Sequence, residues 1–173
     1  MKVKKLMNSE ITSCGPETGV VTAARMMAES GVGALPVING GRVVGMITDR
    51  DICLALGSKG EAALNTRVDE VMSAELYNCF TDDDLESALK TMRRKRVHRL
   101  PVFDRNGDLQ GILSISDFAL RAHRLDAKNG LSYKSVLRAY RRICGLPRSK
   151  DKPALNEEPR PALPRTDATA AKG

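Results

Sequence analysis

The sequence contains no tryptophan, and aromatic residues make up only 3% of its 173 positions. Proteins that hold single-stranded nucleic acid by base stacking need exposed aromatic side chains, so this shortage argues against that class. No apolar run approaches the roughly 18 residues that a membrane-spanning helix requires, and no apolar signal core follows the basic start of the chain. We therefore expect a soluble, cytoplasmic protein without a membrane partner.

Histidine and cysteine are also scarce. The two histidines, His98 and His123, have no partner at metal-ligand spacing. The four cysteines form no Cys-x-x-Cys pair, so we expect reduced thiols, with a redox-active pair of Cys14 and Cys79 as the alternative. No nucleophile–base pair and no paired carboxylates stand at a working spacing. We expect neither an enzyme nor a resident metal or cofactor.

The sequence does contain a long internal repeat, because residues 3–54 and 68–120 are two copies of one unit. At an offset of 65 the matches run from Val3 and Val68 to Leu35-Pro36-Val37 and Leu100-Pro101-Val102. One residue is then inserted in a turn, and the matches continue at an offset of 66. Each half alone is marginal in size for an independent core. We therefore expect the halves to pack together around a pseudo-two-fold axis.

Each copy predicts the same order of elements, β-α-β-β-α, and hence an α/β fold. Helical spacing of apolar residues predicts the first helix, with Thr18 and the acidic run 81–84 as N-terminal caps. Asn, Asp and Gly between the last two strands predict a hairpin turn. The other predicted elements are extended segments Val3–Met7 and Val68–Met72, strands Ala34–Ile38, Arg99–Phe103, Val43–Ile47 and Leu109–Leu113, and helices Asp49–Leu56 and Ile115–His123.

A hydroxyl–x–x–Asp motif opens the last helix of each copy, as Thr48 to Asp51 and as Ser114 to Asp117. A helix N-terminus attracts phosphate, a hydroxyl adds a hydrogen-bond donor, and a carboxylate can accept both hydrogens of a ribose diol. The same spacing also fits a helix-capping box, and one hydroxyl can serve both purposes. Gly45 and Gly111, just before the motifs, would let a ligand approach the strand closely.

Basic residues beside these motifs supply further candidate ligand contacts. Arg50 either reaches a phosphate or stays an exposed cation, and Arg99 faces either a cleft or solvent. Copy one has Gly33-Ala34 where copy two has His98-Arg99. We therefore expect two clefts that differ in charge and in occupancy.

Taken together, these features resemble a tandem pair of CBS domains, also called a Bateman module. The residues that carry the resemblance are Met7 and Met72, the alanine-rich helices, 33–37 with 97–102, and above all Gly45–Asp51 with Gly111–Asp117. The resemblance implies two clefts for AMP, ADP, ATP or S-adenosylmethionine, a regulatory role and a homodimer. It implies phosphate contacts for Thr48, Ser114, His98 and Arg99, and ribose contacts for Asp51 and Asp117. It also implies a base pocket lined by main chain near Ile11–Ser13 and Leu76–Asn78. No output domain accompanies the pair, so the resemblance predicts a stand-alone module with an unknown protein target.

The C-terminal part of the chain carries much of the net charge of +7. We predict the first repeat at 1–62, the second at 66–124, a basic amphipathic helical extension at 125–147 and a disordered Pro/Ala-rich tail at 148–173. In the extension, Val136, Leu137, Tyr140 and Ile143 are expected to form one apolar stripe. The basic segment 121–152 raises an alternative function, a dimerising scaffold that binds nucleic acid or a protein partner there. Nucleic acid is the less favoured of these partners, because no recognised reading motif is present.

Overall fold

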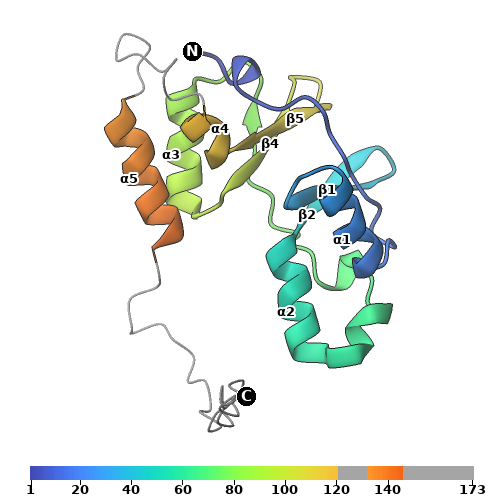
Figure 1. Cartoon of the computed structure of the whole chain (residues 1–173). Helices are drawn as coiled ribbons and strands as arrows, with labels where there is room; N and C mark the ends of the chain where they lie inside the picture. Colours follow the sequence, from blue (N-terminus) through green and yellow to red (C-terminus); the bar gives the residue numbers. More distant parts are fainter. Residues whose placement is uncertain (121–131, 146–173) are drawn as a thin grey trace, which may run out of the picture.

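The structure, a computed structural model, describes residues 1–120 and 132–145 (Figure 1). Two lobes are visible, one built around the hairpin β1–β2 and the other around the sheet β3–β4–β5. The helices and strands are η1 (Val3–Lys5), α1 (Val20–Glu29), β1 (Ala34–Asn39), β2 (Arg42–Thr48), α2 (Asp49–Lys59), η2 (Gly60–Asn65), η3 (Val68–Glu70), β3 (Cys79–Phe80), α3 (Leu85–Lys95), β4 (Arg99–Phe103), β5 (Leu109–Ser114), α4 (Ile115–Leu120) and α5 (Tyr133–Cys144). The α/β fold of two repeats with a C-terminal helix is confirmed, with the order β-α-β-β-α in repeat two and α-β-β-α in repeat one.

The two hairpins share one register. Ala34 pairs with Thr48 in the first hairpin, and Arg99 pairs with Ser114 in the second. Each hairpin has a register shift directly after the Leu-Pro-Val strand, and positive φ angles at Gly40, Gly41 and Gly107 form the turns. This common register delivers Thr48 and Ser114 to the same relative position, where each strand passes into a helix.

The sequence prediction for the opening segment of each repeat is wrong. Residues 3–7 and 68–72 were expected to be extended, but they contain the 3-10 helices η1 and η3. The apolar residues Val3 and Leu6 are three apart, which is the period of a 3-10 turn. In repeat two, the strand that precedes α3 lies later in the sequence than predicted; it is β3, which pairs in parallel with β4. In repeat one only a parallel bridge from Cys14 to Val37 stands at that place.

The two repeats exchange these opening segments. Val3, at 0% exposure, lies in the core of the second lobe, and its amide donates to the Asp83 carbonyl at 2.9 Å. Val68, also at 0%, lies in the core of the first lobe, and its amide donates to the Thr18 carbonyl at 2.8 Å. Figure 1 shows the N-terminal segment passing from the second lobe to the first. Neither core is therefore built from one repeat alone.

The exchange also changes the interpretation of Gly45 and Gly111. A Cβ on Gly45 would lie 2.9 Å from the Ser73 carbonyl oxygen, and a Cβ on Gly111 would lie 2.5 Å from that of Asn8. Both contacts are shorter than real Cβ atoms make with backbone. These glycines make room for the crossing main chain of the other repeat, not for a ligand as the sequence suggested.

The predicted caps of the first helices are also wrong. Gly19 is the N-cap of α1 and Asp84 is the N-cap of α3, and neither makes a side-chain cap hydrogen bond. Thr18 Oγ1 instead accepts from the Gly15 amide at 3.1 Å, and Asp83 accepts from the Phe80 amide at 2.9 Å. Thr18 and Asp83 thus stabilise the loops that precede α1 and α3, and because their oxygens accept hydrogen bonds there, they do not cap the helices.

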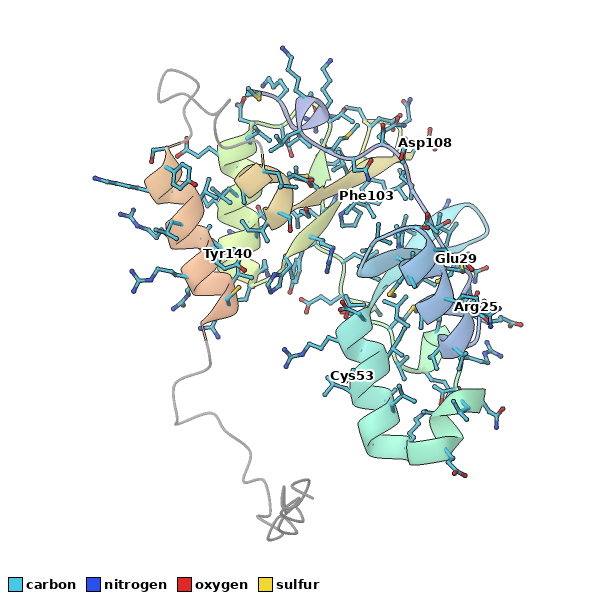
Figure 2. All side chains as sticks on the ribbon, viewed as in Figure 1. Arg25, Glu29, Cys53, Phe103, Asp108 and Tyr140 are labelled. Carbon is cyan, nitrogen blue, oxygen red and sulfur yellow. The ribbon has the colours of Figure 1, made fainter. Side chains whose placement is uncertain are left out.

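Each pair of helices is covered by a third helical segment. In repeat one, η2 continues from α2 and packs on α1, with Ala63 fully buried. In repeat two, α5 packs on α3 and α4 through Val136, Ala139 and Ile143. Leu137 and Tyr140 are 55% and 48% exposed, so the predicted apolar stripe is wrong in these two positions (Figure 2). Ala139, at 1% exposure, lies in the packed face instead.

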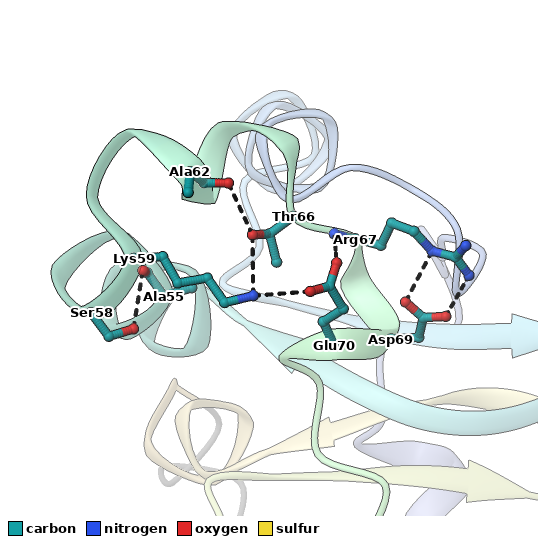
Figure 3. Close-up of polar contacts among 8 residues, drawn as sticks. All are labelled: Ala55, Ser58, Lys59, Ala62, Thr66, Arg67, Asp69 and Glu70. Carbon is teal, nitrogen blue, oxygen red and sulfur yellow. Dashed lines mark hydrogen bonds and ion pairs between the residues drawn. The ribbon is translucent and has the colours of Figure 1, made fainter.

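Polar contacts fix the linker between the repeats (Figure 3). Lys59 Nζ donates to Thr66 Oγ1 at 3.3 Å and pairs with Glu70 at 3.0 Å. The buried hydroxyl of Thr66 donates to the Ala62 carbonyl, so its polar group is satisfied.

Within the described residues, no helix is long and apolar enough to cross a membrane. The expected helix end at His123 and the tail 148–173 lie outside the described residues.

Candidate functional site

The hydroxyl–x–x–Asp motif forms the same hydrogen-bonded ring at both helix starts. In α2, the Asp51 amide donates to Thr48 Oγ1 at 3.2 Å, and Asp51 Oδ2 accepts from the Thr48 amide at 2.9 Å. In α4, the Asp117 amide donates to Ser114 Oγ at 3.2 Å, and Asp117 Oδ2 accepts from the Ser114 amide at 2.7 Å. The capping interpretation of the motif is therefore confirmed, and the ring fixes both carboxylates.

One oxygen of each aspartate remains available. The hydroxyls of Thr48 and Ser114 donate to the Oδ2 atoms of Asp51 and Asp117 at 2.6 and 2.8 Å, so Oδ2 carries all the bonds of the ring. Within the described residues, Oδ1 of neither aspartate has a hydrogen-bond partner. A carboxylate oxygen held in this way can accept from a ligand hydroxyl without disturbing the cap.

The first cleft, which we call cleft 1, lies between the start of α2 and the second repeat. Its volume is about 480 Å³. Thr48, Arg50 and Asp51 come from repeat one, whereas His98 and Arg99 come from the start of β4. The other lining residues are Ala34, Met46, Asp49, Ser73, Glu75, Leu76, Tyr77, Arg96, Val97 and Pro101. Five of the seven predicted site residues thus meet in one cavity.

The second cleft, cleft 2, lies beside the start of α4 and has a volume of about 240 Å³. Ser114 and Asp117 line it from repeat two, and Arg99 reaches it as well. The other lining residues are Asn8, Glu10, Thr12, Gly31, Val32, Gly33, Ala34, Ile112 and Ser116. All seven predicted residues therefore line one of the two clefts, and Arg99 lines both.

The two clefts are built by the same rule. Each cleft has the hydroxyl–x–x–Asp motif of one repeat on one side. Its other side is the loop before the first helix of the other repeat and the start of that repeat's Leu-Pro-Val strand. The repeat offset pairs their walls position by position, for example Thr48 with Ser114, Asp51 with Asp117, and His98 with Gly33. Because most wall positions follow this correspondence, the cavities are products of the duplication and not incidental gaps between lobes.

Cleft 1 is rich in cations that have no carboxylate partner. Within the described residues, Arg50, Arg96 and Arg99 form no ion pair. Desolvation, together with the charges of Arg99 and Arg50, lowers the pKa of His98, against a smaller raising effect of Asp49. Asp49, Asp51 and Glu75 also line the cavity, so its three arginines stand against three acids. An anion in cleft 1 could still pair with guanidinium groups that have no carboxylate partner among the described residues.

Two lining residues of cleft 1, Glu75 and Arg96, were not singled out in the sequence. Arg96 ends α3 in a left-handed conformation with φ of 57°, which turns the chain into the cleft. Tyr77 donates to Glu75, a hydrogen bond that raises the pKa of the phenol, and Lys95 lies 4.4 Å from its ring centroid. Tyr77 and its repeat equivalent Thr12 lie in the two segments that the resemblance to CBS pairs implied for the base pocket, and they line cleft 1 and cleft 2 respectively.

The described residues contain no cluster of His, Cys, Asp or Glu that could hold a metal. All four cysteines are free, and Cys14 and Cys79 belong to separate cores, so these two do not form the redox pair considered as an alternative. Burial raises the pKa of Cys14, and burial with the nearby Asp83 raises the pKa of Cys79 to about 12. These buried thiols stay protonated and unreactive at neutral pH.

Two CBS domains match this chain, at residues 3–58 and 68–123. The chain belongs to the CBS domain family. The CBS domain-containing protein YhcV of Bacillus subtilis is 37% identical over 118 residues, which cover 68% of this chain and 83% of that protein. This CBS pair thus has a relative of similar extent.

Solved structures support the same fold. A CBS-domain protein of Agrobacterium tumefaciens is 28% identical, with a TM-score of 0.66 over 72% of this chain and 100% of that one. A CBS domain pair solved with 5-methylthioadenosine and S-adenosyl-L-methionine is 20% identical, with a TM-score of 0.65 over 72% of this chain and 98% of that one. At that identity, the second structure shows a likeness of fold alone.

Proposed function

We propose that this CBS pair is a regulatory module that binds an adenosine-containing ligand, AMP, ADP, ATP or S-adenosylmethionine, in the clefts between its repeats. The observation that carries the proposal is the duplicated cleft in which Oδ1 of a fixed aspartate has no hydrogen-bond partner among the described residues. A ribose diol fits this acceptor, and the adjacent helix start and cations suit a phosphate or another anionic group.

The proposed roles follow from position. Asp51 and Asp117 would accept from ribose hydroxyls, and Thr48 and Ser114 would hold those carboxylates while lying near the phosphate. Arg50, His98 and Arg99 would face the phosphate in cleft 1, where all three line the cavity. A neighbour of the same fold was solved with two adenosine compounds, so ligands of this class have been found on this fold.

A melting experiment tests the proposal. A ligand at about 100 times its dissociation constant stabilises the folded state by about 2.7 kcal/mol, which raises the melting temperature by several degrees. We expect such a rise with at least one of AMP, ADP, ATP and S-adenosylmethionine. The double variant Asp51→Asn with Asp117→Asn should lose it, because the amide replaces an acceptor oxygen in each cleft by a donor.

The control is Asp108→Asn, which changes an exposed acid in a hairpin turn outside both clefts. It should keep the full ligand-induced rise. The proposal is wrong if none of the four compounds moves the melting temperature of the parent protein at millimolar concentration.

The homodimer, the cytoplasmic location and the lack of catalysis stay predictions of this proposal. Sedimentation equilibrium of the purified chain tests the dimer. The alternative partner surface on α5 also stays a prediction: Lys134, Arg138, Arg141 and Arg142 are exposed there, beside Leu137. That surface would bind a polyanion in a salt-sensitive way.

A further inference from the structure

Two equivalent positions, Ala34 and Arg99, line both clefts. They correspond at the repeat offset of 65, and each opens the Leu-Pro-Val strand of its repeat. They therefore mark the place where the clefts meet across the pseudo-two-fold axis. A symmetrical pair would place an arginine at both positions, but this chain has only one.

Arg99 is held at this junction without a fixed partner. Its Nη2 atom lies 3.0 Å from the point where a Cβ on Gly33 would stand, and Asp49 Oδ2 lies 2.7 Å from the same point. The missing side chain of Gly33 thus leaves space for both groups. Within the described residues, Arg99 makes no ion pair, and it lines both cavities, so a ligand in either one could supply its partner.

Apart from this shared residue, the clefts differ in their cations. Cleft 1 also has Arg50, Arg96 and His98, whereas the equivalent positions in cleft 2 are Ser116, Gly31 and Gly33. Cleft 1 is also lined by the acids Asp49, Asp51 and Glu75, and cleft 2 by Glu10 and Asp117. With Arg99 counted in both, cleft 1 has three arginines against three acids, whereas cleft 2 has one arginine against two acids. It also has half the volume of cleft 1, about 240 against 480 Å³.

We infer that the clefts have different ligands: cleft 1 binds the phosphorylated adenosine compound, and cleft 2 binds one without a phosphate, with Arg99 coupling them. This inference rests on the proposed function and specifies it. A phosphate in cleft 1 draws the guanidinium of Arg99 into a charge-assisted hydrogen bond. Cleft 2 then loses the one cation that lines it among the described residues, so it rejects a second phosphate but still admits a neutral nucleoside.

Titration calorimetry with AMP and with adenosine tests this assignment. Loss of one charge-assisted hydrogen bond weakens binding by about tenfold or more. We expect that loss for AMP in Asp51→Asn and in Arg99→Gln, and a change of less than about threefold in Asp117→Asn. Adenosine should behave in the opposite way, with its site lost in Asp117→Asn and kept in Arg99→Gln. A second AMP should bind the parent about tenfold more weakly than the first, or not at all.

Arg94→Gln is the matched control, because it removes the same charge from an exposed position on α3 that lines neither cleft. It should leave AMP affinity unchanged within about twofold. If Asp51→Asn and Asp117→Asn weaken AMP equally, or two AMP molecules bind with equal affinity, the inference is wrong and the proposed function stands. If neither AMP nor adenosine binds the parent protein, the proposed function fails and the inference with it.

Discussion

At the scale of single residues, two short motifs organise both clefts. Thr48 with Asp51 and Ser114 with Asp117 close a capping ring that uses only one carboxylate oxygen. The sequence could predict this arrangement because a capping box depends on residues three apart. It could not predict Arg96 in cleft 1, since a cavity wall from the other repeat is a tertiary property.

His98 gives a residue-scale prediction. Desolvation and the charges of Arg99 and Arg50 disfavour its imidazolium form, so its pKa in the folded protein should lie below the ordinary value of about 6.5. The folded state then binds fewer protons than the unfolded state. The contribution of His98 therefore lowers the free energy of unfolding as the pH falls below about 6.5.

An NMR titration of the His98 ring measures this directly. Its midpoint should rise in Arg99→Gln, because one of the two repelling cations is removed, and should stay in place in the matched variant Arg94→Gln. A midpoint at or above 6.5 in the parent protein would show that the cations of cleft 1 do not act on this imidazole.

At the scale of elements, strands with regular patterns were easier to predict than short segments. The hairpins of both repeats follow from Leu-Pro-Val, from the turn residues and from the second apolar run, and their boundaries agree within one residue. The segments around Val3 and Val68 were expected to be extended because each is too short to show a helical period. Their 3-10 conformation depends on packing against the other repeat.

The exchanged 3-10 segments predict a specific loss of stability. Val3→Ala and Val68→Ala each remove apolar contacts from a fully buried position in a core built by the other repeat. We expect each to lower the free energy of unfolding by about 1.5–3 kcal/mol, measured by urea denaturation. Val21→Ala, at a position that is 42% exposed, should change it by less than about 0.5 kcal/mol. Equal effects at the three valines would contradict the exchange.

At the scale of the whole molecule, duplication explains both the fold and the site. Each core contains a segment of the other repeat, and each cleft has walls from both. The sequence could predict the pseudo-two-fold pair from its internal offset. It could not predict the exchange of segments, because a match between two copies says nothing about which copy a segment packs against.

The two repeats differ at the positions that supply cations to the clefts. The cations of cleft 1 have become serine and glycine at the equivalent positions of cleft 2, while the aspartate ring is kept in both. The third helical segment also differs, with η2 covering one helix pair and α5 the other. The module therefore offers two related sites of unlike charge, joined through Arg99.

A crystal structure of the protein grown with AMP is the most direct test of the claim that these clefts bind adenosine compounds. We predict AMP in cleft 1, with its ribose hydroxyls on Asp51 Oδ1 and its phosphate against Arg99 and His98. An AMP-saturated crystal in which cleft 1 is empty, or in which AMP sits away from both aspartates, would contradict the account.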